Sequence, residues 1–347
     1  MRTSLLFATF FLLASFPALA QSCQTSSDMD DASRAAIVNA ANRFFDVAAR
    51  GDTASLQQNA IPSLAANFSS IAAVLKDNHD LLVGAKATPR PPFLLKADGT
   101  APIERAEFLC GVFGARGQTA DSAVFVLNNL PPGTYAVDTL DAVSPKATIA
   151  LSFVLQQVGT DWKIGGLYAK NTEVDGHTAQ WFADRARDFK AKGQTLNAWF
   201  YFLEARDLAV PVPFMSTQFT DKLYDESQAV KPADLPSPDH PLGLVVPAPV
   251  MKAGPKSGEQ FNASYSRNFQ VIDLYPTILG NDLDLVVRYR VSDISDTGKT
   301  FEQNMTVIKA LIAKYPEFRD AFTAIVARAV APSGQDYGSL LAIQDIK

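Results

Sequence analysis

The chain has 347 residues, of which 47% are hydrophobic and 10% aromatic, enough for packed cores rather than disorder. Its 31 Lys and Arg residues against 36 Asp and Glu residues give a net charge of −5, which argues against the basic surface of a nucleic-acid-binding protein. Beyond the first twenty residues no segment is apolar for long enough to span a bilayer. We therefore expect a mildly acidic globular protein with no nucleic-acid partner and no integral membrane segment in its mature form.

Residues 1–20 contain the three regions of a secretory signal peptide in the usual order. Arg2 is the only charge, an apolar run follows it, and the segment ends in Ala-Leu-Ala at 18–20, the pattern that a signal peptidase reads. The run is too short for a transmembrane helix, and the alternative is a buried N-terminal helix. We expect an exported chain, periplasmic or secreted, that begins at Gln21 and carries a charge of 30 − 36 = −6.

Cys23 and Cys110 are the only cysteines. In an oxidising compartment a disulfide between them is expected, and an intermolecular pair is the alternative. Lipid attachment at Cys23 is disfavoured, because the polar Gln21 lies in the stretch that a lipoprotein signal keeps small or apolar. Two distant cysteines and three histidines make a poor zinc set, so no metal and no cofactor is expected.

The first domain is expected over 21–172 and begins with helices. Apolar residues recur at helical spacing through 32–50, and Gly51 stands where a glycine ends a helix. A further apolar helical stretch covers 64–75. Four prolines make 84–102 loop-like.

After residue 120, apolar residues recur at every second position, the spacing of a β-strand, instead of at helical spacing. Residues 123–130 form a short predicted strand, and the prolines and glycine at 131–133 form a turn. Alternating apolar and polar residues at 148–156 and 162–168 predict two half-buried antiparallel strands joined by a turn. Helices followed by a curved antiparallel sheet predict an α+β domain.

This order of elements resembles the nuclear transport factor 2-like superfamily, which includes relatives of ketosteroid isomerase and polyketide cyclase. The residues that carry the resemblance are Phe44, Phe45, Gly51 and Asp52 at the end of the first helix and Asp161, Trp162, Lys163 and Ile164 in the closing strands. The resemblance covers 32–170, although 76–120 does not match. It implies a cone-like sheet that wraps around helices and leaves a pocket. Some members are enzymes, and many exported members only bind.

A helical hairpin is predicted at 178–211, within a helical region over 173–230. Its small and aromatic residues resemble a single tetratricopeptide repeat, but one repeat cannot bury its own face. The alternative, an ordinary hairpin packed on a sheet, is favoured. Seven prolines then mark 231–257 as a linker or wrapped loop in which neither a helix nor a central strand can form.

A smaller β-β-α-β-β domain is expected over 258–347, with an antiparallel sheet and one helix on a face. The predicted strands are 269–278, 283–291, 322–330 and 339–346. Thr300 and Gln303 form a possible capping box for the helix, which Pro316 ends.

Gly298, Lys299 and Thr300 are the end of a possible phosphate loop. That loop needs glycine where this chain has Asp293, and a carboxylate there would repel phosphate. A capped helix explains the same residues, so nucleotide binding is not expected. The metalloprotease and common serine hydrolase signatures do not occur.

His79 is the histidine with the best claim to chemistry, because Asp77 and Asp80 beside it could orient it as a base. A solvated turn between a helix and a loop explains the same residues. The other two histidines, His177 and His240, fall in a turn and in the proline-rich segment.

A pocket enzyme of the isomerase kind would need a carboxylate base and an acidic donor. Asp138, Asp141, Tyr135 and Tyr168 have suitable side chains, but their spacing matches no signature. Asp138 and Asp141 are interpreted as solvated loop charges. We therefore assign no catalytic residue.

The sequence favours an exported, non-catalytic binding or protein-interaction module, with an unknown protein or an apolar small molecule as its partner. The first alternative is a small-molecule enzyme of the ketosteroid-isomerase or polyketide-cyclase type that uses an Asp or His79. The second is a structural envelope protein. A deep pocket with a buried carboxylate beside a Tyr or His would favour the enzyme. A filled cone with an exposed apolar patch would favour protein binding.

Overall fold

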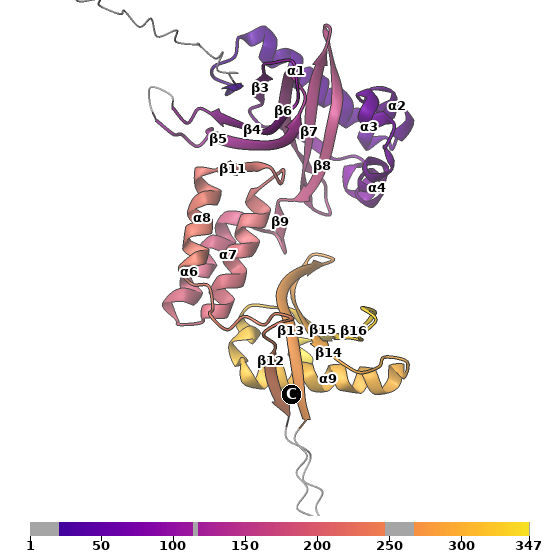
Figure 1. Cartoon of the computed structure of the whole chain (residues 1–347), viewed down its shortest axis with the longest axis vertical. Helices are drawn as coiled ribbons and strands as arrows, with labels where there is room; N and C mark the ends of the chain where they lie inside the picture. Colours follow the sequence, from indigo (N-terminus) through magenta and orange to yellow (C-terminus); the bar gives the residue numbers. More distant parts are fainter. Residues whose placement is uncertain (1–20, 114–116, 247–266, 347) are drawn as a thin grey trace, which may run out of the picture.

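The computed structural model describes residues 21–113, 117–246 and 267–346. The predicted signal peptide, 1–20, lies outside these residues. The described chain is an α+β protein, as predicted, and its three parts follow one another along the long axis (Figure 1). An N-terminal α+β part is followed by a layer of helices and then by a second α+β part.

The N-terminal part contains two antiparallel sheets. The larger has the order β1-β3-β6-β7-β8, and β2 pairs with another stretch of β6. Its strands are β1 (Gln21–Gln24), β2 (Lys86–Pro89), β3 (Phe93–Ala97), β6 (Gly133–Val143), β7 (Thr148–Val158) and β8 (Asp161–Asn171). The smaller has the order β11-β5-β4, with strands β4 (Ile103–Cys110), β5 (Ala123–Leu130) and β11 (Met215–Thr217).

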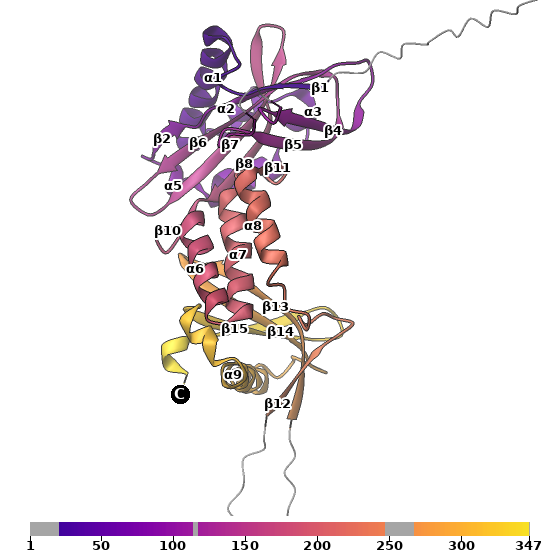
Figure 2. The same cartoon turned by 90° about the vertical axis from the view of Figure 1, so that its left-hand side faces the viewer.

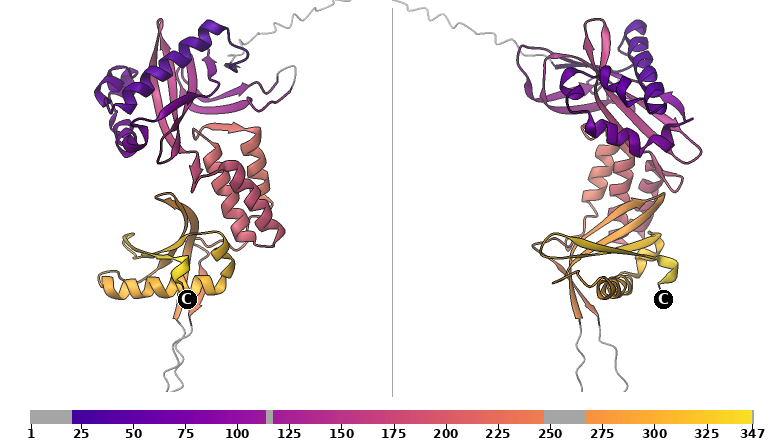
Figure 3. Two further views of the ribbon diagram at one scale, coloured as in Figure 1. Left: turned by 180° about the vertical axis from the view of Figure 1, so that it is seen from behind. Right: turned by 90° about the vertical axis from the view of Figure 1, so that its right-hand side faces the viewer.

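Five helices of the described chain cover the outer face of the larger sheet: α1 (Asp31–Ala49), α2 (Thr53–Gln58), α3 (Pro62–Ala65), α4 (Ser69–Asp77) and α5 (His79–Leu82). The long helix α1 lies across the strands (Figure 3). It begins where the Asp30 carboxylate accepts a hydrogen bond from the Ser33 N–H at 2.8 Å, a standard N-cap. Its buried stripe packs on the sheet, with the Phe44 ring centroid 6.1 Å from that of Phe153.

Each face of the larger sheet buries a different apolar cluster. Ala136 and Leu140 of β6 point toward α1, whereas Tyr135 and Val137 point toward the smaller sheet. β6 is therefore buried on both faces, as a central strand between two layers.

Two sequence expectations for this region are wrong, and one strand was not anticipated. The predicted loop 84–102 contains β2 and β3, the predicted helix 64–75 is divided between α3 and α4, and β6 was not predicted. A strand that is buried on both faces has no alternating pattern to reveal it. The prolines of 84–102 confine the strands to short pieces without abolishing them.

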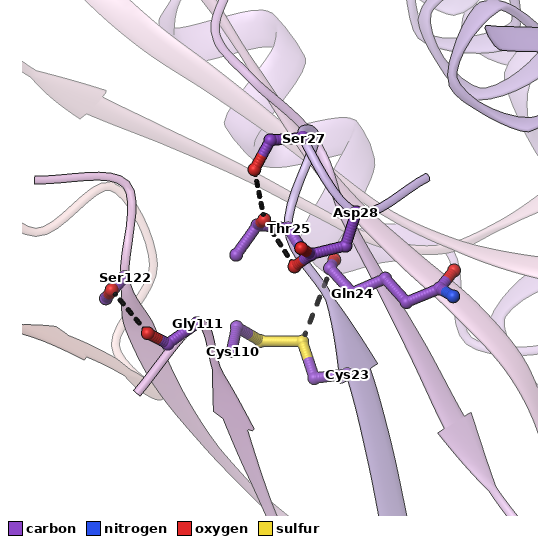
Figure 4. Close-up of a disulfide and its surroundings, with 8 residues drawn as sticks. All are labelled: Cys23, Gln24, Thr25, Ser27, Asp28, Cys110, Gly111 and Ser122. Atoms are coloured by element: carbon purple, nitrogen blue, oxygen red, sulfur yellow. Dashed lines mark hydrogen bonds between the residues drawn. A yellow bond between two sulfur atoms is a disulfide. The ribbon is translucent and has the colours of Figure 1, made fainter. Parts of the chain in front are cut away.

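The disulfide between Cys23 and Cys110 is present, as predicted, with a Cα–Cα distance of 4.9 Å (Figure 4). It joins β1 to the end of β4. Beside it, Gly111 has φ +65°, and an added Cβ would lie 2.9 Å from Cγ2 of Thr25. The Gly111 carbonyl accepts a hydrogen bond from the Ser122 hydroxyl at 3.0 Å, so the chain is tightly held where it leaves the disulfide.

The predicted helical hairpin is present in the middle layer as α6 (Ala179–Ala191) and α7 (Thr195–Ala209), and a third helix, α8 (Gln218–Gln228), follows it. The short strands β9 (Glu173–Val174) and β10 (His177–Thr178) lead into it. Figure 2 shows these helices standing between the two sheet-containing parts. The resemblance of the hairpin to a tetratricopeptide repeat stays a prediction.

The C-terminal part is a sheet of order β12-β13-β14-β15-β16 with α9 on one face. Its elements are β12 (Leu242–Val246), β13 (Arg267–Leu279), β14 (Asp282–Arg290), α9 (Thr297–Lys314), the short helices η1 (Pro316–Asp320) and η2 (Ile343–Asp345), β15 (Ala324–Val330) and β16 (Asp336–Ala342). This part shares one buried apolar cluster with α6, α7 and α8.

The C-terminal part differs from expectation in three ways. β14 and β15 are parallel, so the sheet is mixed, because α9 forms the crossover that parallel neighbours require. Part of the predicted proline-rich linker 231–257 is the edge strand β12, and an edge is where nearby prolines are tolerated. The cap of α9 is Asp296 rather than Thr300, and its carboxylate accepts the Lys299 N–H at 3.0 Å.

No helix in the described ranges is both long and apolar enough to cross a membrane.

Candidate functional site

A groove of about 600 Å³ lies at the C-terminal end of α1. Its apolar wall comes from α1 and from the loop after α5, through Phe45, Ala49, Val83 and Ala85. Asp46, Arg50 and His79 supply its charged and polar groups. Val83 is 52% exposed, so the groove presents apolar surface directly to solvent.

The groove exists because α1 stops at a glycine. Gly51 has φ +69°, a conformation that glycine adopts without strain, and it turns the chain away from α1. An added Cβ would lie 3.1 Å from the His79 ring. Glycine at this position therefore lets His79 pack close to the end of α1.

His79 does not have the base arrangement that its neighbours suggested. It is exposed, and Asp80 is paired instead with Lys146, whose Nζ lies 3.3 Å from the carboxylate. Asp77 is the last residue of α4 and is also exposed. The structure thus places His79 in a groove with Asp46, but within the described residues no carboxylate forms a hydrogen bond to its ring.

Asp138 is fully buried on β6, so its interpretation as a solvated loop charge is wrong. Neither carboxylate oxygen has a hydrogen-bond partner. Burial in the apolar core raises the pKa of Asp138 to about 7, and the nearby Thr139 N–H, short of hydrogen-bond geometry, offsets this only in part. At neutral pH a substantial fraction of this carboxyl group is protonated.

The sheet separates the groups that an isomerase-type site would bring together. Asp138 pairs with Phe153 of β7, which in turn pairs with Leu167 of β8, on the face toward α1. Tyr135 and Tyr168 lie on the opposite face, in and beside the cluster between the two sheets. Side chains on opposite faces of one sheet cannot share a pocket, so Asp138 has no tyrosine partner.

The side chains of Tyr135 and Asp141, also candidates from the sequence, take part in structural contacts. The Tyr135 hydroxyl donates a hydrogen bond to the Pro131 carbonyl at 2.8 Å, and burial raises the pKa of Tyr135. Asp141 lies on β6 rather than in a loop and forms a bidentate ion pair with Arg90, with a shortest N–O distance of 2.7 Å.

A second groove, of about 310 Å³, lies between α6, α7 and η1. Trp181 is 37% exposed there and stacks on His177, with ring centroids 3.7 Å apart. His240 lies outside both grooves, in a turn with Ser237. In the described parts of the chain no group of His, Cys, Asp and Glu side chains is arranged to hold a metal ion.

Glu204 on α7 is a buried carboxylate that sequence patterns did not indicate. Burial raises its pKa to about 7, the negative charge of Asp207 adds to this, and Lys170 opposes it. Lys170 at the end of β8 donates to the Asp207 carboxylate at 2.6 Å. Glu204 and Asp207 are close neighbours on α7, whereas Lys170 lies 37 residues before Asp207, so only tertiary structure brings it to them, at the junction of the N-terminal sheet and α7.

Comparisons of the chain with known protein families, with curated proteins and with solved structures found no match. The groove at the end of α1 and the separation of Asp138 from both tyrosines are therefore the observations on which a function can be argued.

Proposed function

We propose that this protein is an exported, non-catalytic binding module that takes apolar side chains of a protein partner in the groove at the end of α1. The supporting observation is a groove of about 600 Å³ with an apolar wall open to solvent. Open apolar surface on a soluble protein marks an interaction site more often than an enclosed substrate site. Arg50 and His79 at the groove would orient the partner through polar contacts.

The N-terminal segment and the disulfide support export, and the arrangement of the candidate residues supports binding rather than catalysis. The signal-like segment 1–20 and the Cys23–Cys110 disulfide agree with an oxidising compartment. Catalysis requires a base, nucleophile or metal held by its neighbours, whereas His79 has no orienting carboxylate and Asp138 lies on the other side of the sheet from both tyrosines. The nuclear transport factor 2-like resemblance fits a binding role as well as an enzymatic one.

The groove can be tested by changing one exposed valine. Val83→Asp places a carboxylate in the apolar wall, and Val158→Asp is the matched control because Val158, at the end of β7, is equally exposed, 50% against 52%. Native mass spectrometry of protein isolated from its own host should show a bound partner in the wild type and in Val158→Asp. That partner should be lost in Val83→Asp.

A fluorescent apolar anion, anilinonaphthalene sulfonate, gives a second readout. It should bind several-fold more weakly to Val83→Asp than to Val158→Asp. Equal binding of both the probe and the partner to the two variants would contradict the groove as the binding site.

The alternative is a small-molecule enzyme that uses Asp138 as its acid or base. The observation in its favour is a buried carboxyl group whose pKa is raised to about 7, as in sites that keep a carboxylic acid neutral. If native mass spectrometry finds a small molecule that the protein turns over, Asp138→Asn should abolish the turnover, and the alternative would then replace the binding proposal.

A further inference from the structure

The C-terminal sheet has one covered face and one open face. Residues such as Leu285, Val287 and Tyr289 of β14 belong to the cluster formed with α9 and the helical layer, and α9 runs along that side (Figure 1). The alternate residues of β14 point the other way. Val286 on that side belongs to none of the three buried clusters, and its cross-strand neighbours Tyr275 and Val326 are only partly buried.

Strand register places the open-face residues in two neighbouring rows. The first row, the arginine row, crosses the sheet as Asp273, Arg288, Arg328 and Gly338. The second row, the apolar row, crosses it as Tyr275, Val286, Val326 and Leu340. The rows are two residues apart along each strand, about 7 Å.

The two arginines face each other directly on neighbouring strands. Like charges in such a pair destabilise a sheet. Their flanking carboxylates offset this only in part: Asp336 lies 2.9 Å from Arg328, but Asp273 is 3.8 Å from Arg288, beyond hydrogen-bond distance. The Arg288 and Arg328 side chains are 34% and 42% exposed, so a ligand can reach them. The arginine row therefore has unused capacity to bind carboxylates.

The apolar row adds surface of a different kind beside these charges. Val286 is 4% exposed beneath its neighbours, whereas Leu340 on the edge strand β16 is 51% exposed. Gly338 has no side chain, so nothing from that position rises between Arg328 and Leu340. A ligand that reaches the arginines can also cover apolar surface.

We propose that this open face docks an extended acidic segment of a partner protein, with its carboxylates on Arg288 and Arg328 and its apolar side chains on the apolar row. A segment that runs between the two rows projects its successive side chains to opposite sides, toward one row and then the other, so alternating acidic and apolar residues match the two rows. Arginine binds carboxylates in a bidentate manner, which gives such a contact orientation as well as affinity. This site is separate from the groove on α1 and does not depend on it.

A direct test uses three short labelled peptides of equal length, in which valine alternates with Glu, Gln or Lys. Fluorescence anisotropy on the full mature chain at low salt should show binding of the Glu–Val peptide only. Arg288→Gln with Arg328→Gln should weaken it at least about tenfold. Arg105→Gln with Arg206→Gln removes the same charge elsewhere on the surface and should leave it unchanged.

Two further variants keep the test decisive if the double Gln variant is poorly folded. Arg288→Lys with Arg328→Lys retains the charge but loses the bidentate geometry, and should give intermediate affinity. Leu340→Asp should weaken binding by repulsion, whereas Leu109→Asp, at an exposed leucine of β4 (43%), should not.

Several results would overturn the proposal. One is the absence of binding of the Glu–Val peptide to the wild type. Another is equal binding of the Gln–Val peptide, and a third is equal affinity in the arginine variants and their matched control. Inorganic phosphate that binds as tightly as the peptide would instead identify a small-anion site, which also contradicts an acidic protein segment as the occupant.

Discussion

At the scale of single residues, Asp138 conflicts most with its surroundings. Its carboxyl group lies in the apolar core between α1 and the sheet, and neither oxygen has a hydrogen-bond partner. A buried charge without a partner is costly, so the protonated form is favoured and the pKa rises to about 7. The stability of the N-terminal part should therefore depend on pH through this residue.

The pH dependence has a definite sign. The pKa of Asp138 is raised from 3.8 to about 7 on folding, so its stabilising contribution is complete below pH 3.8 and is lost as pH rises to about 7. The loss is about 1.4 kcal/mol per pH unit within this window. Asp138→Asn removes the ionisable group, so the difference in unfolding free energy between wild type and variant should change across this window and level off above it. Urea denaturation at a series of pH values measures this, and parallel curves would contradict it.

At the scale of elements, β1 and α9 are each held by a contact with a distant segment of the chain. β1 has only four residues and pairs with β3 alone, yet it carries Cys23. α9 is held differently, by a buried polar network at Asn304. Each connection can be removed separately.

Loss of the disulfide should destabilise the N-terminal part strongly. The bond closes a separation of 87 residues, for which loop-closure entropy gives about 4–5 kcal/mol. Cys23→Ser with Cys110→Ser should lower the unfolding free energy by this order and should expose the amides of β1 to hydrogen exchange. A change under about 1 kcal/mol, with β1 still protected, would show that the strand is held without the bond.

Asn304 should matter more than its hydrogen-bond partner Tyr289. The Tyr289 hydroxyl donates to Asn304 Oδ1 at 2.8 Å, and Asn304 Nδ2 donates to the Ser339 hydroxyl at 2.8 Å. Asn304→Ala leaves two buried groups unsatisfied and should cost about 2–4 kcal/mol, whereas Tyr289→Phe leaves one and should cost about 1–2 kcal/mol. Chemical denaturation of both variants measures the order, and the reverse order would contradict the network.

At the scale of the whole molecule, the helical layer and the C-terminal sheet share one core. Phe322, just after η1, has its ring centroid 6.0 Å from that of Phe200, and the Tyr201 hydroxyl donates to the Ala321 carbonyl at 2.5 Å. The N-terminal part meets this unit through β11 on β5 and through Lys170 on Asp207. Two unfolding units are therefore expected in a chain of three parts.

Phe322→Ala tests this division. The cavity should cost about 3–5 kcal/mol and should lower hydrogen-exchange protection in α6 and α7 as well as in β13 to β15. α1 and β6 should keep their protection, since their core is separate. Lower protection in the C-terminal strands alone would show that the helical layer is an independent unit.

Elements with a strong local period were predictable. The helix expected at 32–50 is α1 (Asp31–Ala49), and the strand expected at 123–130 is β5. An element that buries only one face keeps a regular alternation of apolar and polar residues, and this alternation can be read from the sequence. β6 was missed because both of its faces are buried. Of the groove, His79 was the only residue named as a candidate for chemistry, and Phe45 was named only for the family resemblance. The apolar wall could not be predicted because it joins the end of α1 to a loop more than thirty residues later.

The sequence by itself determined the acidic balance, the single cysteine pair and the periodic helices and strands, because each depends on composition or on neighbours within a few residues. Only the tertiary structure decided that Asp138 and Tyr135 lie on opposite faces of one strand, that β14 and β15 run parallel, and that Arg288 stands opposite Arg328. Register and face are set by contacts between segments far apart in the chain. A shift of one residue would separate Arg288 from Arg328, or turn Asp138 away from the face toward α1, without changing the local pattern.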